Sequence, residues 1–238
     1  MSALLAGGPA GAVVGPTFSD GAWGRRTIMV LSRTGHRAGF CSGVIVGKDT
    51  ILTAAHCITR PADMRIFYRD QGAPVMLPVR QVRINPGYHA NARITRQRTV
   101  DLALVESATP LPARYQPAEL ASSADAPRIG QSLVIAGYGM GTEGVAQTTG
   151  TLRLGVIELR APLSKVLLWA RDRDHSGVGA CEGDSGSPIF AQGTEAVLAI
   201  TAWADGRGHQ RCGAFTQGTL VAPQRGWILG VMRDWGLR

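Results

Sequence analysis

The chain has 238 residues and a formal net charge of +8; 45% of its residues are hydrophobic and only 18% are charged. Together with 31 glycines and 13 prolines, this composition favours an all-β protein with many turns over a helical bundle, which would carry more charge. No stretch approaches the roughly 20 consecutive apolar residues that span a bilayer, so we expect no membrane partner.

The first twelve residues have features of an export signal. Residues 3–6 are apolar, and Ala10-Gly11-Ala12 has the small-x-small form that signal peptidase accepts. We expect the segment 1–12 to be a signal remnant, although an ordinary loose chain end fits the same residues.

Short strand-like runs, broken by turn residues, then recur in two sets. The first set lies at 27–31, 43–46, 50–53, 64–68, 75–79 and 102–105. The second set lies at 132–136, 152–159, 166–170, 188–190, 196–203 and 218–221. The stretch 108–128 between them is rich in proline and alanine, which is typical of a linker. Two sets of about six strands predict two β-barrels or sandwiches.

The end of the chain changes to helical spacing after Pro223. Large apolar residues recur there at Trp227, Ile228, Val231, Met232 and Trp235. This spacing predicts a terminal amphipathic helix, and its apolar stripe is expected to pack on the protein.

The positive charge comes almost wholly from arginine, because Lys48 and Lys165 are the only lysines. A basic balance favours acidic partners, but an arginine-rich codon usage explains it as well. No basic run interleaves with aromatic residues, so the sequence predicts no nucleic-acid partner.

Four cysteines, an even number, fit an oxidising compartment, so we expect a secreted or periplasmic protein. No C-x-x-C pair occurs, which argues against a zinc site. Four cysteines allow three pairings, and spacing alone does not choose among them.

The strongest chemical signal is the motif E-G-D-S-G-S-P at 182–188. A serine between glycines on a tight turn exposes its hydroxyl, and nearby backbone N–H groups can converge on a developing oxyanion, each worth ~10²–10³ in rate. Taken alone, G-D-S-G also fits a plain turn. Ser185 is therefore a candidate nucleophile.

A serine needs a base to take its proton. His56, in the motif T-A-A-H-C, is the best candidate, because small residues before it leave room for the ring. Asp101 opens the apolar run D-L-A-L-V and is either a polar residue at a strand end or the partner that fixes the imidazole tautomer.

In this order the three motifs resemble those of the chymotrypsin/trypsin family of serine proteases. The resemblance runs from about Val13 to the C-terminus and includes A-G-Y-G at 136–139. It implies an all-β fold of two antiparallel six-stranded β-barrels, with the active site between them and a C-terminal α-helix. Residues 13–115 would form the N-terminal barrel, and residues 116–238 the C-terminal barrel with the specificity pocket.

The resemblance also implies a mechanism. His56 is the general base, Asp101 orients it, and Ser185 is the nucleophile that forms an acyl-enzyme. The N–H groups of Gly183 and Ser185 form the oxyanion hole, and the reaction needs neither a metal nor an organic cofactor. The partners would be protein or peptide substrates and protein inhibitors of a monomeric enzyme.

The cysteine pairing follows from the same resemblance. Cys41–Cys57 matches the bridge beside the catalytic histidine, and Cys181–Cys212 matches the bridge that borders the specificity pocket. Each closed loop is worth ~3 kcal/mol in the chain-entropy model. Other bridges of animal members are missing, which suggests a compact bacterial member.

The pocket is expected to be neutral. Gly179, followed by Ala180, lies where a trypsin-like member has aspartate, so cleavage after Arg or Lys is not expected. Ala202-Trp203 resembles the family's substrate-binding strand, and the walls of the pocket align with Ala204 and Gly218. We therefore expect cleavage after Ala, Val, Leu or Phe.

Activation is expected to involve Asp184, which in the family pairs with a new α-ammonium group. Val13-Val14-Gly15-Pro16 resembles the family's mature start, with Pro16 as a departure from it. Signal-peptidase cleavage after Ala12 would free Val13, so export itself would mature this zymogen-like chain.

Two other interpretations remain. In the first, the chain is a catalytically weak, protease-like binding protein that acts through its basic surface. Such relatives usually lose a catalytic residue, whereas this chain keeps all three. The same residues also suit an esterase. The sequence contains no acidic loop that would indicate a calcium site.

Overall fold

Six strands in the first half of the chain close into an antiparallel barrel. A computed structural model describes residues 21–95, 97–174, 176–206 and 208–236. Around the barrel the strands follow the order β1-β2-β3-β6-β5-β4. Their bounds are β1 Thr27–Thr34, β2 Arg37–Ile45, β3 Thr50–Thr53, β4 Met64–Asp70, β5 Ala73–Ile84 and β6 Ala103–Ser107. Short helical turns accompany them at η1 Gly24–Arg26, η2 Ala55–Cys57, η3 Pro61–Asp63 and α1 Ala92–Thr95.

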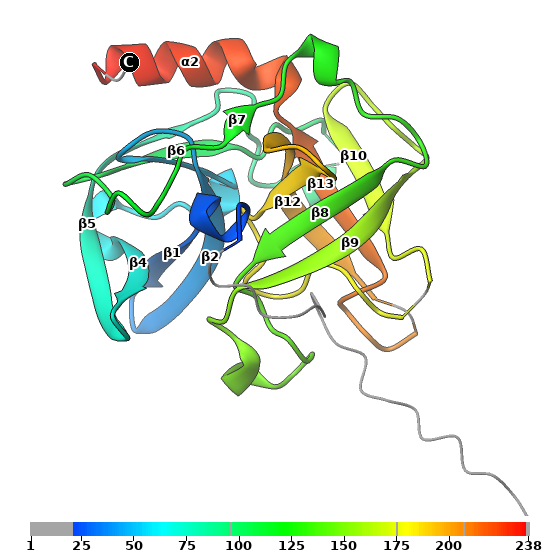
Figure 1. Ribbon diagram of the computed structural model, residues 1–238, viewed down its shortest axis with the longest axis horizontal. Helices are drawn as coiled ribbons and strands as arrows, with labels where there is room; N and C mark the ends of the chain where they lie inside the picture. Colours follow the sequence, from blue (N-terminus) through cyan, green and yellow to red (C-terminus); the bar gives the residue numbers. More distant parts are fainter. Residues whose placement is uncertain (1–20, 96, 175, 207, 237–238) are drawn as a thin grey trace, which may run out of the picture.

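The second half of the chain forms another six-stranded antiparallel barrel beside the first (Figure 1). Its strands are β8 Ser132–Gly137, β9 Arg153–Arg160, β10 Leu167–Arg171, β11 Pro188–Ala191, β12 Ala196–Asp205 and β13 Phe215–Leu220. The pairing of β11 with β12 closes the ring. The prediction of two six-stranded barrels is confirmed.

The predicted linker contains two small elements, a strand and a helical turn, that the sequence pattern does not reveal. The two-residue strand β7 Glu119–Leu120 pairs in parallel with β12 of the second barrel. The helical turn is η4 Ser123–Asp125. Two further turns are η5 Ala146–Thr148, between β8 and β9, and η6 Ala222–Gln224, between β13 and the C-terminal helix.

Each barrel has its own apolar interior, because β-branched and aliphatic side chains alternate along its strands. Ile28, Ile51 and Ile66 are fully buried in the first barrel. Ile135 and Leu168 are fully buried in the second.

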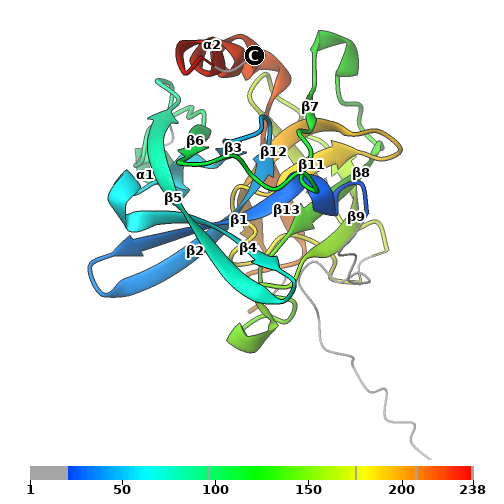
Figure 2. The same cartoon turned by 60° about the vertical axis from the view of Figure 1, so that its left-hand side comes forward.

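A third apolar cluster lies between the barrels and joins them into one core. It unites Leu104 of β6 with Phe190 of β11, and both side chains are fully buried. The C-terminal helix α2 Arg225–Asp234 adds Ile228, which is also fully buried. The helix runs along one edge of the molecule (Figures 1 and 2), so the prediction of a packed terminal helix is confirmed.

A polar contact joins the two barrels outside this core. The almost fully buried guanidinium group of Arg26 bonds to Glu195 Oε2 at 2.5 Å and to the backbone oxygen of Ala22 at 2.6 Å. Trp23 Nε1 donates to the backbone oxygen of Thr194 at 3.3 Å. Thr194 and Glu195 form the turn between β11 and β12, so the start of the first barrel is tied to the second.

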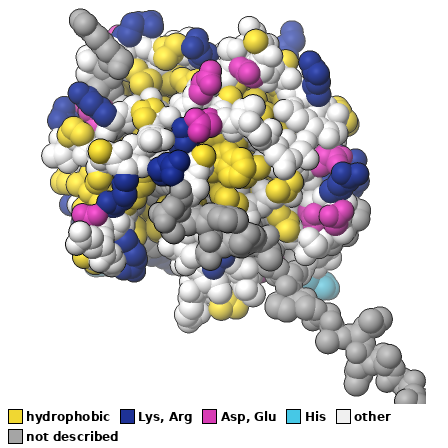
Figure 3. All heavy atoms as spheres, viewed as in Figure 1, with side chains coloured by type: hydrophobic (Ala, Val, Ile, Leu, Met, Phe, Trp, Pro, Cys, Tyr) yellow, Lys and Arg dark blue, Asp and Glu magenta, His cyan; other side chains and the backbone are white. Residues whose placement is uncertain are grey.

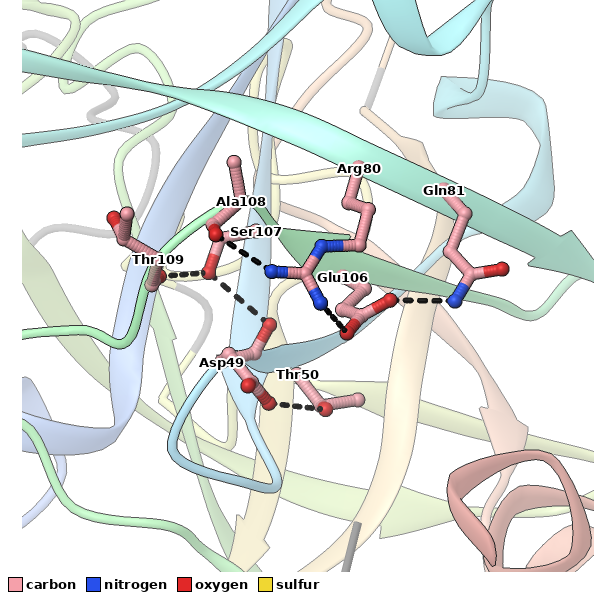
Figure 4. A network of polar contacts seen from close by, with 8 residues as sticks. All are labelled: Asp49, Thr50, Arg80, Gln81, Glu106, Ser107, Ala108 and Thr109. Atoms are coloured by element: carbon pink, nitrogen blue, oxygen red, sulfur yellow. Dashed lines mark hydrogen bonds and ion pairs between the residues drawn. The ribbon is translucent and has the colours of Figure 1, made fainter. Parts of the chain in front are cut away.

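A polar network lies where β6 leaves the first barrel (Figure 4). Glu106, only 2% exposed, accepts hydrogen bonds from Arg80 Nη1 at 3.1 Å and from Gln81 Nε2 at 2.5 Å. The hydroxyl of the next residue, Ser107, donates to the backbone oxygen of Asp49 at 3.2 Å. A buried carboxylate is costly unless it is paired and hydrogen-bonded. The network therefore supports this end of the barrel.

Charged side chains of both signs share the surface. On the face shown in Figure 3, Lys and Arg side chains lie scattered, with acidic side chains among them. Among the described residues, no helix has the length and apolar composition needed to traverse a bilayer.

Candidate active site

A cavity of about 630 Å³ is lined by side chains from both barrels. The first barrel contributes His56 and Asp101, and the second contributes Ser185, Trp203 and Gln217. The fold therefore brings together, in one cavity, three residues that are far apart in the sequence.

Asp101 holds His56 at two points. The turn η2 follows β3 directly, so the end of this strand fixes the backbone of His56. Its backbone N–H donates to Asp101 Oδ1 at 3.0 Å, and its ring Nδ1 lies 2.7 Å from Asp101 Oδ2. The Asp101 side chain is only 11% exposed, whereas that of His56 is 35% exposed. The carboxylate thus orients a ring that stays open to the cavity.

Ser185 lies in a tight turn that we call the Ser185 turn, residues 181–187. The N–H of Asp184 donates to the backbone oxygen of Cys181 at 3.0 Å, and the N–H of Ser187 donates to that of Asp184 at 2.9 Å. Ser42 on β2 donates its N–H to the backbone oxygen of Ser185 at 2.8 Å. Within the described part of the chain, no hydrogen bond joins the Ser185 hydroxyl to the His56 ring. Such contacts often tighten only when substrate binds.

Gly183 adopts a backbone conformation that requires glycine. Its φ is +93°, and a Cβ atom there would lie 2.4 Å from the ring of Phe40. Ser42 Oγ donates to the backbone oxygen of Gly183 at 3.0 Å. The N–H groups of Gly183 and Ser185 donate to no acceptor among the described residues, so both are available to a ligand.

Asp184 is fully buried beneath this turn. Its Oδ1 accepts the N–H of Gly139 at 2.8 Å, and its Oδ2 accepts the N–H of Cys181 at 3.0 Å. A Cβ atom at Gly137 or Gly139 would lie 2.1 or 2.4 Å from the carboxyl group, so both glycines make room for it. Burial raises the pKa of Asp184 to about 7, although the two N–H bonds oppose this shift. The expected partner Val13 lies outside the described residues, as do Ala10, Gly11 and Ala12.

The structure brings only part of the predicted specificity pocket into the cavity. Ala202, Trp203 and Ala204 line it. Gly179 and Ala180 are buried behind Gly213, whose N–H donates to the backbone oxygen of Ala180 at 3.2 Å. These two residues do not line the cavity.

Gly218 points away from the cavity as well. A Cβ atom at this position would lie 2.8 Å from Ile189 Cδ1, in the interior of the second barrel. Its neighbours Gln217 and Thr219 line the cavity instead, because successive residues of a strand face opposite sides.

Several further lining residues were not predicted, among them Trp169, Glu143 and Arg211. Trp169 on β10 meets Trp203 edge to face, with ring centroids 5.8 Å apart. Glu143 accepts the backbone N–H of Arg211 at both carboxylate oxygens, at 2.9 and 3.0 Å. Aromatic residues and charges at loop positions are the only sequence signals for this set, and they do not show which loops meet.

The two predicted disulfides, Cys41–Cys57 and Cys181–Cys212, are confirmed. Among the described residues, the one group with metal-ligand spacing is Cys41, His56 and Cys57. Both of its sulfur atoms are bonded to each other, so the group offers no thiolate ligand.

The family model described as Trypsin matches residues 12–228. Kallikrein-8 of Rattus norvegicus is 27% identical over 188 residues, which cover 73% of this chain and 68% of that protein.

Two solved structures share the fold. GrC superposes with a TM-score of 0.76 at 19% identity, covering 91% of this chain and 97% of that one. A scabies mite inactivated protease paralogue superposes with a TM-score of 0.72 at 22% identity, covering 90% and 96%. Rat and mite are animals, so these relatives give no support to the bacterial source expected from the missing bridges.

Proposed function

Since the chain belongs to the trypsin family of serine proteases and is a serine endopeptidase, we propose that Ser185, His56 and Asp101 carry out its chemistry. The observation that carries this proposal is that Asp101 holds His56 through two hydrogen bonds within the cavity that Ser185 also lines. The Asp101 carboxylate favours the tautomer with the proton on Nδ1, which leaves Nε2 free to accept one.

The steps follow from this arrangement. Ser185 Oγ attacks the carbonyl carbon of the scissile bond while its proton passes to His56 Nε2. The protonated imidazole then gives this proton to the leaving amine, and the peptide C–N bond breaks. Water, deprotonated by the same nitrogen, attacks the acyl-enzyme and releases the acid with Ser185 restored.

The negative charge of the tetrahedral intermediate needs donors that are already in place. We assign this role to the N–H groups of Gly183 and Ser185, because neither is used by another described residue. The positive φ of Gly183 and the bond from Ser42 to its backbone oxygen hold this peptide in position.

Substrate preference is proposed from the lining of the cavity. Ala202, Trp203, Ala204 and Trp169 form an apolar wall on one side of the cavity, while Glu143, Glu182 and Arg211 line other parts of it. An apolar wall favours small to medium apolar side chains before the scissile bond. The closure of Gly179 and Ala180 behind Gly213 further limits the space for a long basic side chain.

We also propose that the enzyme is secreted or periplasmic, acts as a monomer on proteins or peptides, and matures when cleavage after Ala12 frees Val13. The two disulfides support an oxidising compartment. The buried Asp184 carboxylate, which has backbone N–H donors but no ion pair among the described residues, supports a missing cationic partner. Equal activity of chains that begin at Met1 and at Val13 would exclude this maturation step.

Labelling with an organophosphonate tests the catalytic assignment. The wild-type chain that begins at Val13 should be labelled at Ser185 and should hydrolyse casein, whereas the same chain with Ser185→Ala should do neither. Ser123→Ala, which removes an exposed hydroxyl from η4, is the matched control and should behave as wild type.

The outcome also separates the other functions. Absence of labelling in a folded wild-type protein would favour a binding protein, and the inactivated mite paralogue shows that this fold also occurs without protease activity. Labelling with cleavage of esters but not of casein or a mixed peptide library would favour an esterase. Strict cleavage after Arg would contradict the proposed preference.

A further inference from the structure

Arg153, the first residue of β9, has an unusual set of partners. Its Nη1 atom donates to the backbone oxygens of Thr148 at 2.6 Å, Thr151 at 3.3 Å and Gly139 at 3.4 Å. The residue is half-buried, and no carboxylate lies within ion-pair distance of it among the described residues. A half-buried cation that contacts only carbonyl groups lacks the anion that would normally balance it.

Asp184 is the complementary case. It is a fully buried carboxylate whose described partners are the N–H groups of Gly139 and Cys181. The peptide units of Gly139 connect the two ions: the N–H of this residue donates to Asp184, and its backbone oxygen accepts from Arg153.

The glycines of this segment fit that arrangement. A Cβ atom at Gly139 would lie 2.4 Å from the Asp184 carboxyl group. A Cβ atom at Gly141 would lie 2.5 Å from Arg153 Cζ. Two glycines two residues apart thus leave space for the anion and for the cation.

Resting on the proposed function, we propose that, in the chain whose Val13 amine is not yet free, Arg153 is a positioning residue that balances the charge of Asp184 across Gly139 and so keeps the Ser185 turn in the form that offers both oxyanion N–H groups. The β8–β9 loop, residues 138–152, carries this effect, because Arg153 bonds near both of its ends. Asp184 in turn receives the N–H of Cys181, where the Ser185 turn begins.

The electrostatics point the same way. Arg153 is the charged side chain whose field acts on Asp184, and it lowers the pKa of this carboxyl group against the larger effect of burial. Glu182, the other acidic residue of the Ser185 turn, is exposed. Removing the Arg153 charge should therefore move protonation of Asp184 to higher pH.

The test compares Arg153→Met, Arg153→Lys and wild type in the full chain. The rate of organophosphonate labelling at Ser185 is measured from pH 5 to pH 10, and urea unfolding is measured over the same range. Arg233→Met, which removes one exposed charge from α2, is the matched control.

We expect Arg153→Met to label about fivefold more slowly than wild type at pH 7 and about tenfold more slowly at pH 5, because a rise of about one unit in the pKa of Asp184, from about 7, lowers its ionised fraction by these factors. The difference in labelling rate between the two proteins should become smaller above pH 9, where Asp184 is ionised in both. Arg153→Lys keeps the charge and should remain within about threefold of wild type. In urea, the fall in stability with rising pH should extend to higher pH in Arg153→Met than in wild type.

Two results would overturn the inference. Superimposable pH profiles for wild type and Arg153→Met would show that the charge does not act on the turn. Equal slowing of the Met and Lys variants at every pH would show that Arg153 only packs. Failure of wild type to label even as the chain that begins at Val13 would instead contradict the proposed function.

Discussion

At the scale of single residues, the Asp184 carboxylate is the most costly group in the site. It is fully buried, and its two hydrogen bonds come from neutral backbone donors. The glycines at 137 and 139 are required by its volume, since either Cβ atom would overlap it. The motif A-G-Y-G therefore has a physical cause, which is the space that a buried anion needs.

Asp184→Asn tests this cost through pH. The folded-state pKa, about 7, is higher than the ordinary value of 3.8, so the folded wild type binds more protons between these values. Its free energy of unfolding should then decrease as pH rises from about 4 to about 7 and level off above that. The Asn variant, which cannot titrate here, should lack this decrease.

The measurement is urea unfolding of both proteins, as full chains, at pH 4.5 and pH 8. The free energy of unfolding of wild type should fall, relative to that of the Asn variant, between pH 4.5 and pH 8. Parallel behaviour of the two proteins would mean that burial does not control this carboxyl group. In either case Asn should lower activity, because its amide group accepts at only one of two atoms.

At the scale of elements, two loops close one side of the cavity. Glu143 in the β8–β9 loop holds the backbone N–H of Arg211, in the loop between β12 and β13. The next residue, Cys212, is bonded to Cys181 at the start of the Ser185 turn. Neither loop is a regular element, so their mutual position depends on these contacts.

Glu143→Ala should loosen this side of the cavity. Hydrogen bonds to a charged group contribute about 1.5–3 kcal/mol, and the partial exposure of Glu143 reduces this. We expect KM for a substrate with a small apolar residue before the scissile bond to rise about threefold to tenfold, with little change in kcat.

Glu143→Gln keeps one acceptor oxygen and should give an intermediate KM. Steady-state kinetics with two peptides, one carrying Ala and the other Phe before the scissile bond, provide the measurement. KM should rise less for the Phe peptide than for the Ala peptide, because a wider entrance weakens the binding of a large side chain less than that of a small one. An unchanged ratio between the peptides would show that this contact does not shape the cavity.

Most strands were predictable from their sequence pattern, and the exceptions have local reasons. The bounds of β3 match the prediction, since all four residues are buried and the run is purely strand-forming. The strand β5 extends from Ala73 to Ile84, beyond the predicted 75–79. Exposed residues and prolines break its pattern, while a bulge at Val79/Gln81 preserves its pairing with β6. The boundary predicted at residue 115 stays a prediction.

The site was less predictable than the fold. Ser185, His56 and Asp101 lie in local motifs, so each was visible in a short stretch of sequence. Trp169, Glu143 and Arg153 were not, because they gain their partners only when separate loops and strands meet. A single sequence contains no local signal for such contacts.

At the scale of the whole molecule, the shared core predicts that the barrels unfold together. Leu104, Phe190 and Ile228 pack in one cluster that belongs to both barrels and to α2. No barrel can lose this cluster without exposing apolar surface of the other.

Ile228→Ala should therefore destabilise the entire protein. Truncation of a fully buried isoleucine typically costs about 2–5 kcal/mol. Tryptophan fluorescence and organophosphonate labelling should be lost at the same, lower temperature. Arg233→Ala, on the exposed face of α2, should leave the transition near that of wild type. A separate early transition with labelling retained would contradict a common core.

The Ser185 turn belongs to the second barrel, but side chains of the first barrel contact it and restrict its conformation. A Cβ atom at Gly183 would strike the ring of Phe40, and one at Gly186 would strike Thr53 Oγ1, 2.1 Å away. Ser42 binds the turn at the backbone oxygens of both Gly183 and Ser185. A change in the relative position of the two barrels should therefore displace the nucleophile. The reactivity of Ser185 should then report on how the two barrels are packed against each other.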